Sequence, residues 1–176
     1  ISVLTKSGNS FTFPTPTRSG YTYVGWSTSS SASSGVKSLT PSSNTTYYAV
    51  WSYNDTQNPT VSLSSTNNVA SSQTVTISLS DNVGIMGYYW GTSSTYSNNS
   101  YTSTLSTSIS KTVDTSGTYY ATAVDTSGNV SSNVSITFYK TTLNANGGSV
   151  SPTSVLTKSG NSFTLPTPTH SNSNYS

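Results

Sequence analysis

Few side chains in this chain are of the types that enzymes use for acid–base or nucleophilic chemistry. The acidic residues are all aspartate, at positions Asp55, Asp81, Asp114 and Asp125, and His170 is the single histidine. A serine or threonine nucleophile needs a positioned base, usually histidine, and glycoside hydrolysis needs two carboxyl groups that face one cleft. A histidine close to the end of a sequence is usually solvated. This inventory predicts that the chain is not an enzyme and holds no catalytic residues.

The chain is rich in hydroxyl side chains and poor in charge. Of its 176 residues, 42 are serine and 32 are threonine, whereas only 6% are charged. The formal net charge is +2, but the six cations are scattered along the sequence, and a nucleic-acid site needs them clustered. No apolar run approaches the roughly 20 residues that cross a bilayer. We therefore expect no nucleic-acid partner and no membrane insertion of this segment.

One stretch of the sequence occurs twice. "SVLTKSGNSFTFPTPT" (Ser2 to Thr17) returns 152 residues later as "SVLTKSGNSFTLPTPT" (Ser154 to Thr169), with Phe13 against Leu165 as the only difference. Identity of this length is a true internal repeat. Because the pattern is already under way at Ile1, we expect an internal piece of a longer tandem array, cut slightly longer than one period.

Alternation of apolar and polar residues predicts strands along most of the chain. In the first 51 residues, Gly8 and Asn9 between two alternating runs predict a β-hairpin with its turn at these residues. The following "PTPT" ends the second strand because proline cannot donate to a ladder. Between residues 53 and 140, six further runs are separated by turn residues at the spacing of a sandwich. In one of them, Val75, Ile77 and Leu79 are expected to form a buried face. The predicted fold class is all-β.

Two motifs in the middle of the chain resemble the bacterial immunoglobulin-like domains that recur in large surface proteins. They are "LSDNVGI" (Leu79 to Ile85) and "GTYYATAVDTSGNVS" (Gly117 to Ser131). The resemblance implies a seven-stranded immunoglobulin-like β-sandwich over residues 53–140. It also implies that Tyr119 is the tyrosine-corner residue and that Ala121 stands where an antibody domain carries its second cysteine.

The flanking segments resemble a second family, the Listeria–Bacteroides repeat of internalin-type bacterial surface proteins. The matching pieces are "NANGG" (Asn144 to Gly148), "PTPTRSGYTYVGW" (Pro14 to Trp26) and "TTYYAVW" (Thr45 to Trp51). The resemblance implies small β-grasp modules. Residues 1–52 would be one such module without its first strand, and residues 141–176 would be the opening part of the next.

Together the two resemblances imply a non-enzymatic stalk or fibre segment of an extracellular, adhesin-like protein on a bacterial cell surface. Its partners would be neighbouring repeats of the same protein. A first alternative is an adhesive module that binds glycans or a host surface through exposed aromatic rings, with Tyr88, Tyr89 and Trp90 as the candidate platform and Tyr96 and Tyr101 nearby. A second alternative is a filament subunit, in which residues 141–152 of one chain supply the missing strand to residues 1–51 of another.

The same resemblance points to one possible cofactor. In related adhesin domains, aspartates at equivalent places gather a calcium ion, and here these are Asp55, Asp81 and Asp125. Calcium takes six to eight oxygen ligands, so Asn82, Asn129 and carbonyl groups would have to contribute. The competing interpretation is that aspartate and asparagine simply favour the turns at these corners.

Two covalent modifications are also conceivable from the sequence. Surface domains of this kind often carry a lysine–asparagine isopeptide bond, for which Lys111 and Asn133 are the candidates, although a solvated lysine is the simpler interpretation. Sequons at Asn44 and Asn133 agree with a surface location, but they are common by chance in a chain so rich in asparagine, serine and threonine.

Overall fold

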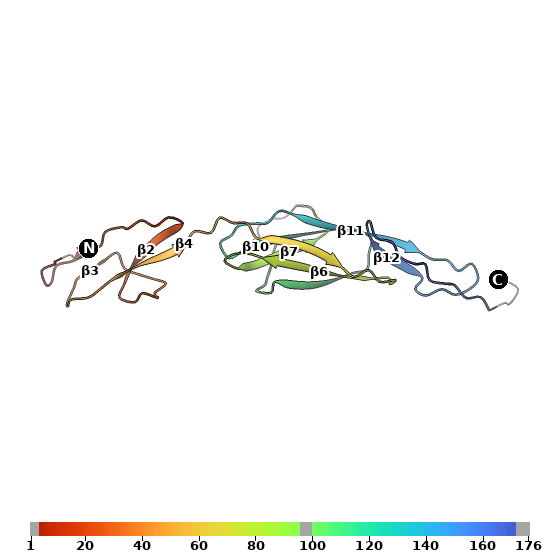
Figure 1. Ribbon diagram of the computed structural model, residues 1–176, viewed down its shortest axis with the longest axis horizontal. Helices are drawn as coiled ribbons and strands as arrows, with labels where there is room; N and C mark the ends of the chain where they lie inside the picture. Colours follow the sequence, from red (N-terminus) through yellow and green to blue (C-terminus); the bar gives the residue numbers. More distant parts are fainter. Residues whose placement is uncertain (1–3, 96–99, 172–176) are drawn as a thin grey trace. The chain divides into compact units, whose positions relative to one another are not determined.

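The computed structural model describes residues 4–95 and 100–171, and this part of the chain is all-β. Its strands pair in antiparallel sheets, and none of the described residues is helical. No described segment forms a helix with the length and hydropathy needed to span a membrane. The chain divides into two compact units, Ile1–Asp55 and Thr56–Ser176, which are described separately below (Figure 1).

The first unit contains two short antiparallel pairs of strands. Strand β1 (Phe11–Thr12) pairs with β3 (Ser38–Leu39), and β2 (Tyr21–Ser27) pairs with β4 (Tyr48–Tyr53). A bulge in β2 brings Gly25 against Gly35, where an added Cβ would lie 2.6 Å from the Gly35 carbonyl carbon. Glycine is therefore required at this crossing of two backbones.

Aromatic rings fill the interior of the first unit. Phe13 lies 5.7 Å from Trp26 and 5.0 Å from Tyr47 between ring centroids, and the Trp26 indole nitrogen donates to the Pro14 carbonyl. Among the described apolar residues of this unit, Val50 is the one that is fully buried. The unit therefore depends on ring-to-ring contacts more than on an enclosed aliphatic core.

The second unit consists of two antiparallel sheets. One has three strands in the order β5-β6-β9, and the other has five in the order β12-β11-β10-β7-β8. The strands are β5 (Thr60–Ser65), β6 (Gln73–Ser80), β7 (Ile85–Gly91), β8 (Thr102–Ser103), β9 (Ser108–Val113), β10 (Gly117–Asp125), β11 (Val134–Thr142) and β12 (Ser154–Lys158).

The two sheets share one apolar interior, as the layers of a sandwich do. Val75, Ile77 and Leu79 of β6 are at most 4% exposed, which confirms the face that the sequence predicted. Ala121 and Ala123 of β10 are completely buried in the same cluster as Ile77 and Leu79. Because each sheet buries only one face here, the outward serines and threonines of both sheets are free to face water.

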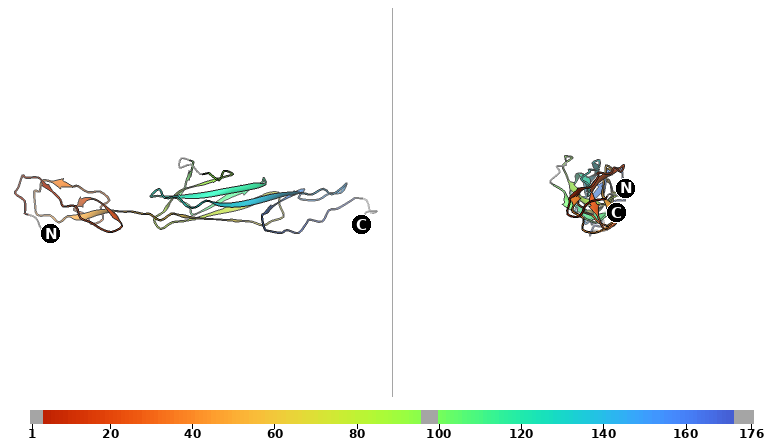
Figure 2. Two further views of the ribbon diagram at one scale, coloured as in Figure 1. Left: turned by 90° about the horizontal axis from the view of Figure 1, so that it is seen from above. Right: turned by 90° about the vertical axis from the view of Figure 1, so that its left-hand side faces the viewer.

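Strand β11 runs through the domain boundary that the sequence predicted between residues 140 and 141. We expected one segment to end at residue 140 and another to begin at 141. In the structure the first half of β11 pairs with β10, and residues 138–142 pair with β12 in the order Phe138↔Lys158 to Thr142↔Ser154 (Figures 1 and 2). The boundary does not coincide with a break in the sheet, because a continuous strand can belong to two ladders.

Strand β12 is held from the opposite sheet as well as by β11. Leu156 is completely buried beside Phe138, and its backbone nitrogen donates to the Ala70 carbonyl at 2.9 Å. The buried Gln73 amide donates to the Leu156 carbonyl at 2.6 Å and to the Asn68 carbonyl at 2.7 Å. Its oxygen accepts from the hydroxyl of Thr66. Buried polar groups are stable only when bonded in this way.

The two copies of the repeat have the same turn but different strands. Gly8 and Gly160 have φ of 86° and 83°, and the bond that closes the turn, Asn9 N–H to Lys6 O or Asn161 N–H to Lys158 O, measures 3.1 and 3.0 Å. The predicted turn is therefore confirmed. The predicted hairpin is wrong among the described residues, because the two arms of each copy do not pair with each other. One arm of each copy forms a strand, with a partner from elsewhere.

The hydroxyl of Tyr119 bonds to the backbone upstream of it. It donates to the Thr115 carbonyl at 3.1 Å, and the ring stacks on Trp90 at 5.4 Å between centroids. A hydroxyl bonded to the backbone a few residues upstream is what a tyrosine corner requires. This contact closes the turn between β9 and β10.

We predict that Tyr119→Phe lowers the free energy of unfolding of the second unit by about 1 kcal/mol, because the ring contacts remain and only the hydroxyl bond is lost. The control is Tyr139→Phe, since Tyr139 is 62% exposed, and its effect should stay within about 0.5 kcal/mol. Urea unfolding followed by tryptophan fluorescence measures both values. Equal losses in the two variants would contradict the role given to the Tyr119 hydroxyl.

Candidate metal centre

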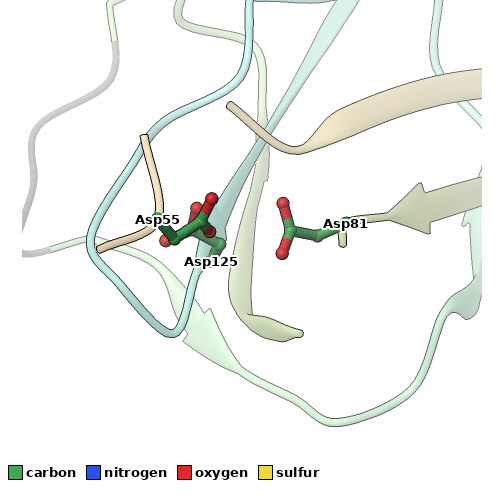
Figure 3. A group of neighbouring side chains, drawn as sticks. All are labelled: Asp55, Asp81 and Asp125. Atoms are coloured by element: carbon green, nitrogen blue, oxygen red, sulfur yellow. The ribbon is translucent and has the colours of Figure 1, made fainter. Parts of the chain in front are cut away.

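Three aspartates that are far apart in the sequence lie together in the structure. Asp55 directly precedes Thr56, the first residue of the second unit, Asp81 follows β6, and Asp125 ends β10. One carboxylate oxygen of each lies within 4.8 Å of the others, and Figure 3 shows Asp81 projecting toward the other two. These are the three residues proposed from the sequence as calcium ligands.

A tight turn fixes Asp81. Its Oδ2 accepts the backbone N–H groups of Val83 and Gly84, both at 2.8 Å. Gly84 has φ of 152°, which side-chain-bearing residues rarely adopt, and this explains the glycine in "DNVG". The other oxygen, Oδ1, is buried and accepts no hydrogen bond from the described residues. A buried carboxylate oxygen in this state is a ready ligand for a cation.

Asp125 is completely buried and is held by the loop that follows it. Its Oδ1 accepts the backbone N–H groups of Ser127 and Asn129, and its Oδ2 accepts the Asn129 side-chain amide, each at 2.8 Å. Burial by itself raises the pKa of Asp125, but the hydrogen bonds from Asn129, Ser127 and Gly128 outweigh it and hold the pKa below its ordinary value. Asp125 is therefore a carboxylate at neutral pH.

The spacing of the three carboxylates suits a calcium ion. Calcium lies about 2.3–2.6 Å from each oxygen, so two of its ligands can be up to roughly 5 Å apart. Two unscreened negative charges at 4.8 Å repel by roughly 3–4 kcal/mol at an effective dielectric constant near 20. A divalent cation would convert this repulsion into attraction. With only three carboxylates available, backbone carbonyls and water would have to complete the six to eight oxygens.

The asparagines expected to assist have different positions. Asn129 orients Asp125 through its side-chain amide, and its backbone carbonyl accepts from the Asp125 N–H. Asn82 is exposed in the turn after Asp81. The turn interpretation also holds in part, because both Asp81 and Asp125 cap turns with one oxygen. The fourth acid, Asp114, is exposed and is not part of the group.

The aromatic platform expected on β7 is not an exposed surface. Tyr88 is 4% exposed and belongs to the core, and Trp90 is half-buried and stacked on Tyr119. Tyr89 lies on the other face of β7 and is also half-buried, with its hydroxyl against Gly91. Residues 88 and 90 share the inward face of the strand, so the three rings do not form one exposed surface. Ligand binding by these rings stays a prediction from the sequence. Tyr96, also named for that platform, lies outside the described residues.

The remaining candidates are distributed over the second unit. Lys111 lies with its ammonium 5.2 Å from the centroid of the Tyr88 ring, and the Asn133 amide donates to the Ser94 carbonyl and accepts from the Thr122 hydroxyl. An isopeptide bond between these two residues stays a prediction from the sequence. His170 is exposed.

Sequence reasoning did not single out Gln73, the buried residue that connects the two sheets through Leu156. A signal was present in the sequence. Gln73 stands two residues before Val75, in register with the apolar face of β6, and a polar residue at an inward position has to bond to something in the core.

No family model matches this chain, and no curated protein or solved structure matches it either.

We predict that calcium raises the melting temperature of the second unit and that chelation reverses the rise, because an ion bound only by the folded state stabilises it by mass action. At a concentration 100 times the dissociation constant the gain is about 2.7 kcal/mol. Asp125→Asn should abolish the calcium-dependent rise, whereas Asp114→Asn should retain it. Scanning calorimetry with and without calcium measures this. If the melting temperature of the wild-type chain is the same with and without calcium, the calcium site is excluded.

Proposed function

We propose that this chain is a structural, non-enzymatic repeat segment of a stalk or fibre on a bacterial cell surface. The observation that carries the proposal is the duplicated stretch, whose two copies are 152 residues apart, the second of them supplying the edge strand β12 of a folded β-unit. A period that contains a complete folding unit allows length to grow with copy number. The resemblance of the flanking segments to the Listeria–Bacteroides repeat, and of the middle to bacterial immunoglobulin-like domains, supports the extracellular location.

The order of strands in the second unit supports an immunoglobulin-like assignment. Its three-stranded sheet β5-β6-β9 and the run β8-β7-β10-β11 of the other sheet have the order A-B-E and C′-C-F-G of such sandwiches. The hydroxyl bond of Tyr119 and the complete burial of Ala121 also support this assignment. The β-grasp assignment of the flanking segments depends on the sequence motifs alone.

The chemistry of the surface also suits a spacer. Serine and threonine side chains face outward on β6 and β9, as the exposed positions Thr74, Ser78, Ser108 and Ser110 illustrate. Neutral hydroxyls hydrate a surface without the long-range fields that charged residues produce, so salt should alter its interactions little. Such a surface has little attraction for neighbouring molecules in a crowded cell envelope.

A calcium ion at the three aspartates would serve this function. Asp55 directly precedes the second unit along the chain, Asp81 follows β6 of one sheet, and Asp125 ends β10 of the other. A cation bound there would replace the repulsion among the three carboxylates by attraction. We propose that calcium stabilises the entry of the chain into the second unit.

The adhesive alternative receives less support. Its aromatic platform required exposed rings on β7, and the two residues that face inward there, Tyr88 and Trp90, pack in the core. The large exposed rings among the described residues are instead Tyr48 and Tyr53, at opposite ends of β4, and Tyr139 on β11. Sugar-binding sites need several groups that converge on one place.

We predict that proteins with one, two and three tandem 152-residue periods increase in maximum dimension by a constant step per period. Each added period contributes its own folded unit, whereas a flexible coil grows only with about the square root of its length. Small-angle X-ray scattering measures the dimension. If the increase in maximum dimension shrinks with each added period, the stalk proposal is contradicted. In a separate experiment, binding of a single period to a glycan array would favour the adhesive alternative.

A further inference from the structure

The same leucine of the repeat has opposite environments in its two copies. Leu4 is fully exposed, at 102% of its reference area, whereas Leu156, its counterpart 152 residues later, is completely buried. An exposed leucine alone is common on protein surfaces. Here, however, the same sequence forms a buried strand around Leu156. The segment around Leu4 therefore lacks the partner that its second copy has.

The partner of the buried copy can be read from its contacts. Lys140 of β11 stands opposite Leu156, Ala70 accepts the Leu156 N–H, and the Gln73 amide donates to the Leu156 carbonyl. Most of these contacts involve the backbone of β12 or the leucine side chain. Residues 4–12 and 156–164 are identical, so either copy supplies the same groups to this edge of the sandwich.

The second half of the repeat shows the reverse pattern. In the first copy, Phe11 pairs with Leu39 of β3, and Phe13 packs against Trp26 and Tyr47. In the second copy, the counterpart of Phe13 is Leu165, which is 62% exposed. The second half of the second copy is attached instead near its end, where Thr169 and Ser149 exchange backbone hydrogen bonds.

We infer that the first copy in one chain exchanges with the second copy in another chain. In the exchanged state, residues 4–6 replace residues 156–158 beside β11 of the neighbour, while Phe11 and Phe13 keep their contacts in their own unit. The occupant of the edge is thus a second copy of this chain. The first copy then has both sets of contacts, and residues 154–158 of the displaced copy have lost theirs.

The exchange is nearly balanced in the residues that swap. Leu4 becomes buried as Leu156 becomes exposed, so these two transfer free energies cancel, whereas displacement of the completely buried Val155 opposes the exchange. Lost translational and rotational freedom opposes association. The position of this equilibrium is therefore sensitive to protein concentration and to any change that weakens one of the competing copies.

The geometry of the exchange is head to tail. The surface used on one chain belongs to its first unit, and the surface used on the other belongs to its second, so the contact is heterologous and can continue from chain to chain. The expected product is an open series of oligomers. Its formation requires β12 to leave first, which makes it slow in the wild-type chain.

A matched pair of substitutions tests the inference. Leu156→Asp weakens the resident copy, so at high concentration the weight-average mass should rise to at least twice the 18.4 kDa of one chain. Leu4→Asp alters a fully exposed residue of the monomer and should leave the chain monomeric, as should the double variant. Size-exclusion chromatography with light scattering measures the mass. A folded, monomeric Leu156→Asp chain, or equal oligomers from both single variants, would overturn the inference.

A peptide provides a second measurement that does not depend on assembly. The synthetic peptide ISVLTKSGNSFTF, which has the sequence of residues 1–13, should raise the melting temperature of the Leu156→Asp chain in a concentration-dependent way. The same peptide with aspartate in place of Leu4 should not. If the first peptide neither raises the melting temperature of a folded Leu156→Asp chain nor produces a folding transition in an unfolded one, the inference is overturned. The inference is independent of the stalk proposal, so its failure would leave that proposal intact.

Discussion

The continuity of β11 is the constraint on which the second unit depends. Phe138 stands opposite Gly117 in one ladder and opposite Lys158 in the other, and it is completely buried. Ending the strand at that point would leave the carbonyl and amide groups of the next residues without partners, which is costly in a folded sheet. Because β11 continues, β12 can pair with it at the edge of the five-stranded sheet. Gln73 and Leu156 then connect the two sheets.

The three aspartates add a constraint at the other end of the strands. Asp81 follows β6 of the three-stranded sheet, and Asp125 ends β10 of the five-stranded sheet. A cation shared by them would join the two sheets, as a disulfide joins the sheets of many secreted sandwiches, in a chain that has no cysteine. Turn hydrogen bonds already orient both carboxylates, so little side-chain freedom remains to be lost when an ion binds.

Sequence patterns predicted features that depend on neighbouring residues, such as the faces of a strand. They missed features that depend on residues far away in the sequence, such as which strands pair. Alternation predicted the buried face of β6 correctly, because every second residue of a strand faces the same way. The resemblance brought together Asp55, Asp81 and Asp125, which spacing alone would not have connected. Alternation did not tell which face of β7 lies inside, since both faces carry aromatic residues, and Tyr88 is buried. It also did not reveal that residues beyond 140 continue the sandwich sheet, because a strand pattern does not name its neighbour.

The duplicated stretch shows both kinds of feature, local turns and long-range strand pairing, in a single molecule. Its turn is the same in both copies, with φ of 86° at Gly8 and 83° at Gly160, so the glycine and asparagine decide it locally. Its strands differ, because a strand forms only where another chain segment offers unpaired backbone groups. The repeating unit of the sequence and the folding unit therefore need not share boundaries. In an array of this period, each folded sandwich would take its edge strand from residues that the sequence assigns to the next repeat.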